Sequence, residues 1–207
     1  MTPQKLTIGT IVVALVAVAA ILIAPRLGGT QAAALDLDAH PRLGSAAAPV
    51  SIAIFEDFRC PACAQFDASV VPNVKREFVD TGQASLVFVH FPVLGPASEH
   101  VARIGECVFQ QSNDAFWDMK SPLYRAQGEL DNARRAEELA LTYAPGIDEA
   151  TFRACLASEE SMARVRADRT IATDLNLRGT PSVVVNGQVL ASATVPEVRR
   201  AVEAALR

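Results

Sequence analysis

The chain has 207 residues, of which 50% are hydrophobic and 20% are charged, and its formal net charge is −4 at pH 7. A clustered excess of Lys and Arg is the electrostatic footprint of nucleic-acid binding, so this slightly acidic balance argues against a nucleic-acid partner. The four cysteines, an even number, suit an oxidising compartment outside the cytoplasm.

The N-terminal region contains a long apolar run. Residues 6–24 carry no charge and are rich in Ile, Val, Leu and Ala. About 20 apolar residues cross a bilayer, whereas the apolar core of a signal peptide is usually about 7–15 residues long. We therefore expect a transmembrane anchor, or an uncleaved signal, over residues 6–24, with residues 1–5 in the cytoplasm.

The position of the anchor predicts the domain organisation. Residues 25–45 are expected to form a linker, and residues 46–207 one domain outside the cytoplasm, held at the inner membrane in the cell envelope. The alternative is a cleaved signal, with the small residues 32–34 serving the peptidase. In that case the protein would be periplasmic or secreted.

The first half of the domain has a β-α-β pattern. Residues 51–58 and 85–91 are apolar runs typical of buried strands. Between them Phe66, Val70, Val74 and Phe78 recur at helical spacing, and Pro72 should kink that helix. Gly82 suits the end of the helix.

Two cysteines mark the start of this helix. Cys60 and Cys63 enclose Pro61 and Ala62, and proline is favoured at the first helical position. The first thiol would lie at the helix N-terminus, where unpaired N–H groups and the helix dipole favour a thiolate, and the second thiol would lie one turn further on. The spacing therefore predicts a redox-active dithiol. Half of a zinc site and a permanent structural disulfide are the alternatives, but a zinc site needs further ligands that this chain does not offer.

The second half of the domain starts with a helical block at about residues 97–176. Asp131 and Asp148 are expected to be N-caps within it, and a long helix should run from about Ser161 to Leu177. A β-hairpin follows over residues 182–191, with Asn186 and Gly187 as its turn.

A final helix ends the chain. Thr194 and Glu197 have the spacing of a capping box at its start. The complete order is β-α-β, a helical block, and β-β-α.

This order resembles the DsbA-like thiol:disulfide oxidoreductases, α/β proteins in which a helical domain is inserted into a thioredoxin fold. The resemblance covers essentially the whole of residues 46–207. Its specific marks are residues 55–63 around the cysteine pair, residues 111–117 with the Phe116-Trp117 pair, and residues 179–182.

The resemblance implies roles for the marked residues. Cys60 would be the exposed catalytic nucleophile and Cys63 the buried resolving thiol, joined as a redox-active disulfide when oxidised. Thr180 and Pro181 would form a cis peptide bond beside the dithiol and bind the substrate. From the residues alone, Pro181 is equally well a proline that starts a strand. No cofactor and no metal is implied.

Two positions depart from the family pattern. Ala62 stands where the better-known oxidant has a histidine, and a weaker oxidant is expected because a neighbouring imidazolium would stabilise the thiolate. Ile54 stands where a buried acid that moves protons is common. Glu56 or Asp57 would be substitutes, or else simply surface charges.

The second cysteine pair, Cys107 and Cys155, lies in the helical block. The resemblance implies a structural disulfide, which for a loop of this size would contribute about 4 kcal/mol to stability. Two buried free thiols and a redox relay to the active pair are the alternatives.

The leading functional hypothesis is a dithiol oxidase that introduces disulfides into exported proteins with free thiols. By resemblance it would be reoxidised by a membrane partner of the DsbB or VKOR type. A reductase or isomerase using the same residues is the nearest alternative, and a non-enzymatic tethered binding domain with a structural disulfide is another. We expect a monomer, since the dimerisation module that isomerases often carry is not visible.

Overall fold

A computed structural model of the protein describes residue 35 and residues 37–207. Residues 35–207 form one compact unit. Within the described part of the chain, no helix has the length and apolar character needed to cross a membrane. The predicted anchor at residues 6–24 lies outside the described residues.

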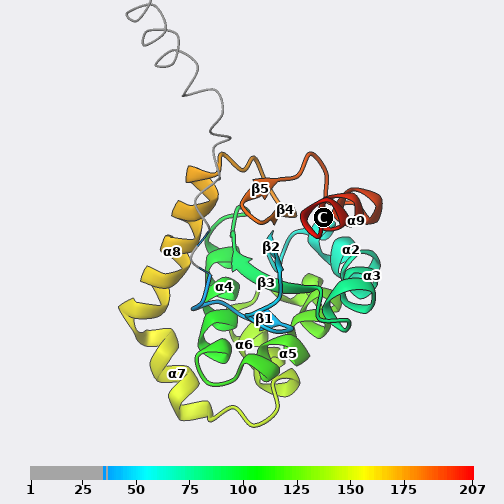
Figure 1. Cartoon of the computed structure of the whole chain (residues 1–207). Coiled ribbons are helices and arrows are strands. Elements are labelled where there is room, and N and C mark those ends of the chain that lie inside the picture. Colours follow the sequence, from blue (N-terminus) through cyan, green and yellow to red (C-terminus); the bar gives the residue numbers. More distant parts are fainter. Residues whose placement is uncertain (1–34, 36) are drawn as a thin grey trace, which may run out of the picture. The chain divides into compact units, whose positions relative to one another are not determined.

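A five-stranded mixed sheet forms the centre of the compact unit (Figure 1). The strand order is β1-β3-β2-β4-β5. Strands β2 and β3 are parallel, and the other neighbours are antiparallel. The strands are β1 (Arg42–Leu43), β2 (Val50–Glu56), β3 (Ala84–His90), β4 (Ser182–Val185) and β5 (Gln188–Val189).

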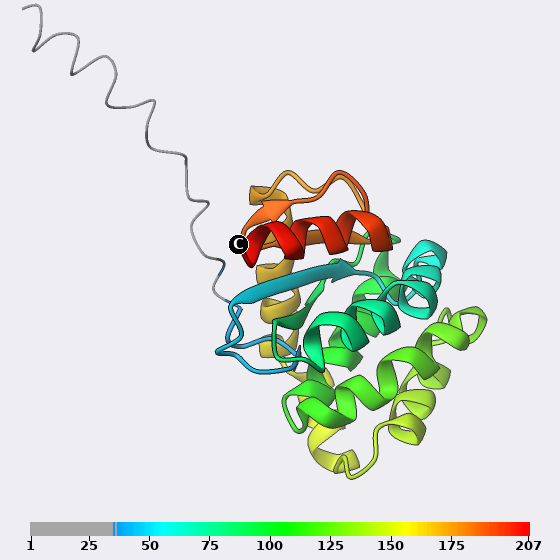
Figure 2. The ribbon, with the colours of Figure 1, turned by 45° about the vertical axis from the view of Figure 1, so that its right-hand side comes forward.

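The helices follow the predicted order, and the predicted thioredoxin fold with a helical insertion is confirmed. The first strand pair is joined by α2 (Pro61–Ser69), α3 (Val71–Val74) and the π-helix η2 (Lys75–Val79). The inserted block consists of α4 (Pro96–Phe109), α5 (Asn113–Arg125), the 3-10 turn η3 (Gln127–Glu129), α6 (Ala133–Tyr143), α7 (Glu149–Ala157) and α8 (Glu159–Asp174). The chain ends with α9 (Val195–Ala205), which lies alongside the sheet (Figure 2).

The alternation of side chains along the strands divides the core into two parts. Ile52 and Ile54 of β2 point into the larger cluster, which most of the helices complete, while Ala53 and Phe55 point into a smaller cluster that includes Ala172 of α8. Since side chains alternate with a period of two, the last residue of β2, Glu56, lies on the side of the larger cluster. This places a carboxylate in the protein interior.

Proline interrupts the helix after β2, as predicted. The helix stops at Ser69 and restarts as α3, with Pro72 in its first turn. Proline has no N–H to donate and its ring collides with the preceding turn of a helix. Gly82 follows with a φ of +73°, a conformation that glycine adopts without strain.

The segment before β2 departs from the predicted linker at residues 25–45. Leu37 is buried in the smaller core cluster, and the two residues of β1 pair with Val87 and Leu86 of β3. The domain therefore includes residues that precede residue 46. A two-residue strand is too short to give a periodic pattern in the sequence.

Two predicted helix caps differ from the structure. Asn132, and not Asp131, accepts a hydrogen bond from the backbone N–H of Arg135 at the start of α6. Thr194 occupies the N-cap of α9 but makes no side-chain capping bond. Asp148 does cap α7, through the N–H of Thr151. A sequence pattern cannot place an N-cap to within one residue, because neighbouring polar residues have similar capping propensity.

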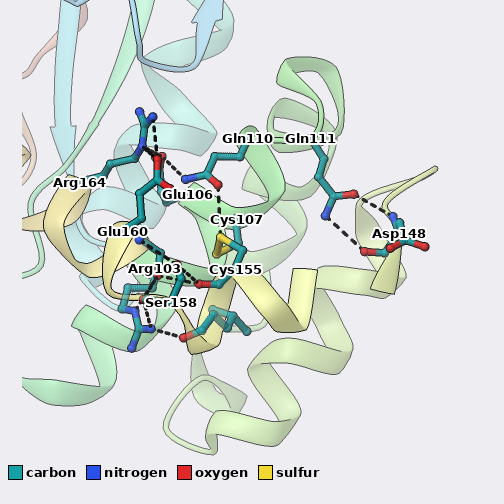
Figure 3. Close-up of a disulfide and its surroundings, with 12 residues drawn as sticks. Arg103, Glu106, Cys107, Gln110, Gln111, Asp148, Cys155, Ser158, Glu160 and Arg164 are labelled. Carbon is teal, nitrogen blue, oxygen red and sulfur yellow. Dashed lines mark hydrogen bonds and ion pairs between the residues drawn. A yellow bond between two sulfur atoms is a disulfide. The ribbon is translucent and has the colours of Figure 1, made fainter. Parts of the chain in front are cut away.

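The second cysteine pair forms a disulfide in the helical block (Figure 3). Cys107 of α4 and Cys155 of α7 have Cα atoms 5.7 Å apart, within the usual range. Beside the bond, Arg103 of α4 donates to the backbone carbonyl of Leu156. The disulfide and this hydrogen bond fix α7 to α4.

We expect the C107A/C155A variant to lose about 4 kcal/mol of unfolding free energy, because the disulfide closes a loop of about 48 residues in the unfolded chain. Urea denaturation of the full-length protein measures this loss. A loss below about 1 kcal/mol, the net worth of one hydrogen bond, would show that the disulfide contributes little to the stability of the block.

His90, the last residue of β3, is a buried histidine without a hydrogen-bond partner for its ring. Its ring packs against Phe88, with centroids 5.0 Å apart, and neither ring nitrogen has a partner among the described residues. Gly105 of α4 permits this packing, since a Cβ there would lie 2.7 Å from Cε1 of His90. Burial lowers the pKa of His90 to about 4, although Asp168 partly opposes the shift.

The pKa of His90 predicts a loss of stability in mild acid. Below its ordinary pKa of about 6.5, His90 takes up a proton in the unfolded chain but not in the folded one until about pH 4. The free energy of unfolding should therefore fall by about 2 kcal/mol between pH 7 and pH 5 because of this residue.

Urea denaturation of the wild type and of His90→Leu at the two pH values measures this contribution. The fall should be smaller by that amount in His90→Leu. Val89→Ala, a buried change with no titratable group, should keep the full pH dependence. Equal falls in the wild type and His90→Leu would contradict the prediction.

Candidate active site

Cys60 and Cys63 lie at the N-terminus of α2. Cys60 is the N-cap residue, and Pro61 begins the helix. The exposed fraction is 9% for Cys60 and 0% for Cys63. Both are free thiols in the structure, and the N–H of Cys63 donates to the carbonyl of Cys60 at 3.0 Å. A partner can thus reach Cys60 first, while Cys63 is closed to solvent.

The loop that leads into the cysteines is held by Asp57. One carboxylate oxygen accepts the N–H of Arg59 at 2.8 Å. The other accepts the N–H groups of Val93 and Leu94, at 2.9 and 3.2 Å. Asp57 is 2% exposed, so it is a structural acid that joins the loops after β2 and β3. The interpretation of Asp57 as surface charge is wrong.

The inserted helical block also holds this loop. The side-chain amide of Gln127, in η3, donates to the carbonyl oxygens of Phe58 and Cys60, both at 2.8 Å. Arg59 forms an ion pair with Asp131, the residue that was expected to be a helix cap. The position of Cys60 therefore depends on the insertion as well as on the thioredoxin core.

Thr180 and Pro181 lie beside the cysteine pair. The peptide bond between them is cis, and the Cys60 thiol donates to the carbonyl oxygen of Thr180 at 3.4 Å. The structure thus brings together all four residues named from the sequence: Cys60, Cys63, Thr180 and Pro181.

A cluster of buried charges lies beneath Cys63. Lys120 of α5 is 1% exposed, and its Nζ lies 2.9 Å from Oε2 of Glu56 and 2.6 Å from Oδ1 of Asp67. The hydroxyl of Tyr124 donates to the same Glu56 oxygen at 3.0 Å. We call these four residues the buried charge cluster. They come from β2, α2 and α5.

The charges in this cluster shift the pKa values of its members and of Cys63. Burial raises the pKa of Glu56, although Lys120 opposes the shift. Burial would lower the pKa of Lys120, but the two carboxylates outweigh it and the pKa is raised. Burial and then the Glu56 carboxylate raise the pKa of Cys63. The negative charge of Glu56 therefore disfavours the thiolate form of Cys63.

Glu56 is a buried carboxylate on the same side of β2 as Ile54. Residues 54 and 56 of β2 point to the same side of the sheet because side chains alternate along a strand. The carboxylate thus reaches the Cys63 side from a position two residues nearer the cysteines. The interpretation of Glu56 as surface charge is wrong, since it is 1% exposed.

Sequence reasoning did not find Lys120, Asp67 or Gln127. Lys120 lies on the apolar face of α5, four residues after Phe116 and three before Leu123. Asp67 follows Cys63 by one helical turn. A charged residue on a helix face that is otherwise buried is a signal of a buried ion pair, and it was available. For Gln127 there was no comparable signal.

A structural zinc site, one alternative for the cysteine pair, has no counterpart in the described residues. They contain no group of three or more His, Cys, Asp or Glu side chains placed to hold a metal.

The thioredoxin family profile matches residues 37–204. The chain belongs to the thioredoxin family. A probable disulfide bond formation protein D of Bacillus anthracis is 36% identical over 169 residues, which are 80% of this chain and 77% of that protein. Within the thioredoxin family, the chain is a DsbA-like protein thiol:disulfide oxidoreductase.

Solved structures of thioredoxin-family proteins share the architecture. Oxidised BdbD from Bacillus subtilis has a TM-score of 0.75 and 27% identity, over 83% of this chain and 95% of that one. Wolbachia pipientis α-DsbA1 has a TM-score of 0.71 and 17% identity, over 83% of this chain and 93% of that one. At this identity the second likeness concerns the fold alone.

We expect Glu56→Gln to lower the pKa of Cys63, because the substitution removes the carboxylate charge that disfavours the thiolate. The measurement is a pH titration of thiolate absorbance in full-length protein carrying Cys60→Ser, so that Cys63 is the free thiol. Glu203→Gln, which removes an exposed carboxylate from α9, is the control and should leave the titration unchanged. A Cys63 pKa that stays the same or rises in Glu56→Gln would show that Glu56 does not act on the thiol.

Proposed function

We propose that the protein is a dithiol oxidase that introduces disulfides into exported proteins through Cys60 and Cys63. The observation that carries this proposal is the 36% identity to a protein named for disulfide bond formation, together with a dithiol in which Cys60 is 9% exposed and Cys63 is fully buried. The same accessibility gives each cysteine its role: Cys60 is the nucleophile and Cys63 the resolving thiol.

The proposed reaction begins from the oxidised pair. A substrate thiolate attacks Cys60, the bond between Cys60 and Cys63 breaks, and Cys63 leaves with its electron pair and takes a proton from Glu56. A second substrate thiolate then attacks the substrate sulfur of the mixed disulfide, and Cys60 leaves as a thiolate. The substrate loses two electrons and the enzyme gains them as a dithiol.

Thr180 and Pro181 are placed where a substrate chain can dock. Proline has no backbone N–H, so Pro181, directly before β4, donates no backbone hydrogen bond within the protein. An extended substrate segment can then pair with the neighbouring backbone of residue 180, as strands added at a sheet edge do. The contact of Cys60 with the Thr180 carbonyl brings the docked segment to the reactive sulfur.

The location and the reoxidant complete the proposal. The apolar run at residues 6–24 would anchor the protein in the cytoplasmic membrane, with the catalytic domain outside. Return to the disulfide form requires removal of two electrons, which a membrane partner of the DsbB or VKOR type would accept. An anchor would keep the domain close to that partner.

The redox potential of the full-length protein, purified in detergent and equilibrated with glutathione, tests the direction. A value between about −180 and −120 mV is expected of an oxidase, and Ala62 favours the weaker end of that range. A value near about −270 mV, as for thioredoxin, would contradict the proposal and indicate a reductase.

A second experiment tests the roles of the residues. Cys60→Ser should abolish oxidation of a reduced protein substrate, whereas C107A/C155A should retain it, since Cys107 and Cys155 lie in α4 and α7 and not in the active-site loop or α2. Oxidation by Cys60→Ser at the wild-type rate would show that another group is the nucleophile.

A further inference from the structure

The loop between β3 and α4 is held in place from the cysteine side of the site. It covers residues 91–95 and has no regular structure. The N–H groups of Val93 and Leu94 donate to Oδ2 of Asp57 at 2.9 and 3.2 Å. The carbonyl of Leu94 accepts from Nη1 of Arg59 at 3.1 Å. Three backbone groups of this loop are therefore bonded to side chains that directly precede Cys60.

Asp57 also holds the turn that carries Cys60. Its second carboxylate oxygen, Oδ1, accepts the N–H of Arg59 at 2.8 Å, the turn that Asp and Asn side chains commonly form with the residue two positions on. The backbone carbonyl of Asp57 accepts the N–H of Cys60 at 2.9 Å. The two oxygens of one carboxylate thus hold two different parts of the site.

The side chains of Val93 and Leu94 are exposed. Their exposed fractions are 42% and 48%, and they are two of the four exposed large hydrophobic residues in the described part of the chain. A single exposed apolar residue is ordinary, but these two are neighbours whose backbone is already fixed. A polypeptide that docks at Cys60 meets them without having to order the loop first.

The chemistry of a carboxylate suits this double task. An ionised carboxylate has two acceptor oxygens and no hydrogen, so it faces three N–H groups without a mismatch. Asp57 is 2% exposed, and all three of its side-chain partners are backbone donors. Backbone donors have fixed positions, so the carboxylate locks the turn and the loop to each other.

We propose that Asp57 is a positioning residue with two separable actions. Oδ1 sets how fast Cys60 is attacked, and Oδ2 holds Val93 and Leu94 ready for the apolar residues that flank a substrate cysteine. The first action concerns every thiol that attacks Cys60, whereas the second concerns only a thiol that belongs to a polypeptide. The inference rests on the proposed function, in which substrate thiols attack Cys60.

Two substitutions separate the two actions. Asp57→Ser keeps a short acceptor that forms the local turn with the N–H of Arg59, although more weakly, but this hydroxyl does not reach the loop. Asp57→Asn has one acceptor oxygen, which we expect to turn toward the two N–H groups of Val93 and Leu94. Its NH2 group then faces the N–H of Arg59, donor against donor. The serine variant therefore releases the loop, and the asparagine variant disturbs the turn.

The measurement is the single-turnover reduction of the oxidised Cys60–Cys63 pair in the full-length protein, purified in detergent and followed by acid quench and thiol labelling. Reduced ribonuclease A, in excess over the enzyme, gives a half-saturating concentration and a limiting rate. Dithiothreitol gives the rate for a small thiol with no polypeptide to dock. Asp148→Ala is the matched control, because it also removes a carboxylate that accepts a backbone N–H, at the start of α7.

We expect Asp57→Ser to raise the half-saturating concentration of reduced ribonuclease A on the order of tenfold, because two side chains must then be ordered on binding. Its rate with dithiothreitol should stay at the wild-type value. Asp57→Asn should show the reverse. Both of its rates should fall on the order of tenfold, since a small displacement of a reacting group is costly, and its half-saturating concentration should not change. Asp148→Ala should be less stable in urea and have wild-type kinetics.

The double variant V93A/L94A tests the loop without a change at Asp57. It removes two exposed side chains and keeps every backbone hydrogen bond of the loop, so its folding does not depend on the buried carboxylate. It should share the raised half-saturating concentration of Asp57→Ser and react with dithiothreitol at the wild-type rate.

The same losses in Asp57→Ser and Asp57→Asn, for both the protein and the small thiol, would overturn the separation into two actions. Wild-type kinetics of V93A/L94A would overturn the role of the loop. Failure of the proposed function is distinguishable from both, because the oxidised wild-type protein would then not oxidise reduced ribonuclease A at all.

Discussion

The active site depends on a buried lysine that is held between two carboxylates. Moving an ion from water into a protein interior costs several kcal/mol, and replacing buried ion pairs by apolar groups is often neutral or stabilising. Lys120, Glu56 and Asp67 are therefore poorly explained as a device for stability. One member of this group, Glu56, raises the pKa of Cys63, the fully buried thiol of the active pair.

This arrangement requires two parts of the chain to be folded together. Glu56 comes from the sheet and Asp67 from the helix that carries the cysteines, whereas Lys120 comes from the inserted block. If α5 did not dock, two carboxylates would be left buried without their cation. The electrostatics of Cys63 is thus a property of the assembled domain and of neither part alone.

Much of the fold could be predicted from the sequence because its signals are local. The strands before and after α2 are continuous apolar runs, Pro72 breaks a helix by its own chemistry, and the Asn186-Gly187 turn has its own preference. The cysteine pair at the start of a helix predicted a redox-active dithiol in the same way, from a local pattern. The features that were missed depend on tertiary packing: a two-residue strand, a cap one residue away, and the partners of Lys120 and Gln127 become visible only when distant segments are placed side by side.

The hydrogen bonds of Gln127 bear on whether the domain could function without its helical block. Its single amide group satisfies two carbonyl oxygens of the loop that leads to Cys60. A shortened protein without the helical block would leave the Phe58 carbonyl without this donor, whereas the Cys60 carbonyl would keep the N–H groups of Cys63 and Ala64; buried carbonyls without partners are costly. Loss of the insertion would therefore require another donor for the Phe58 carbonyl beside the active site.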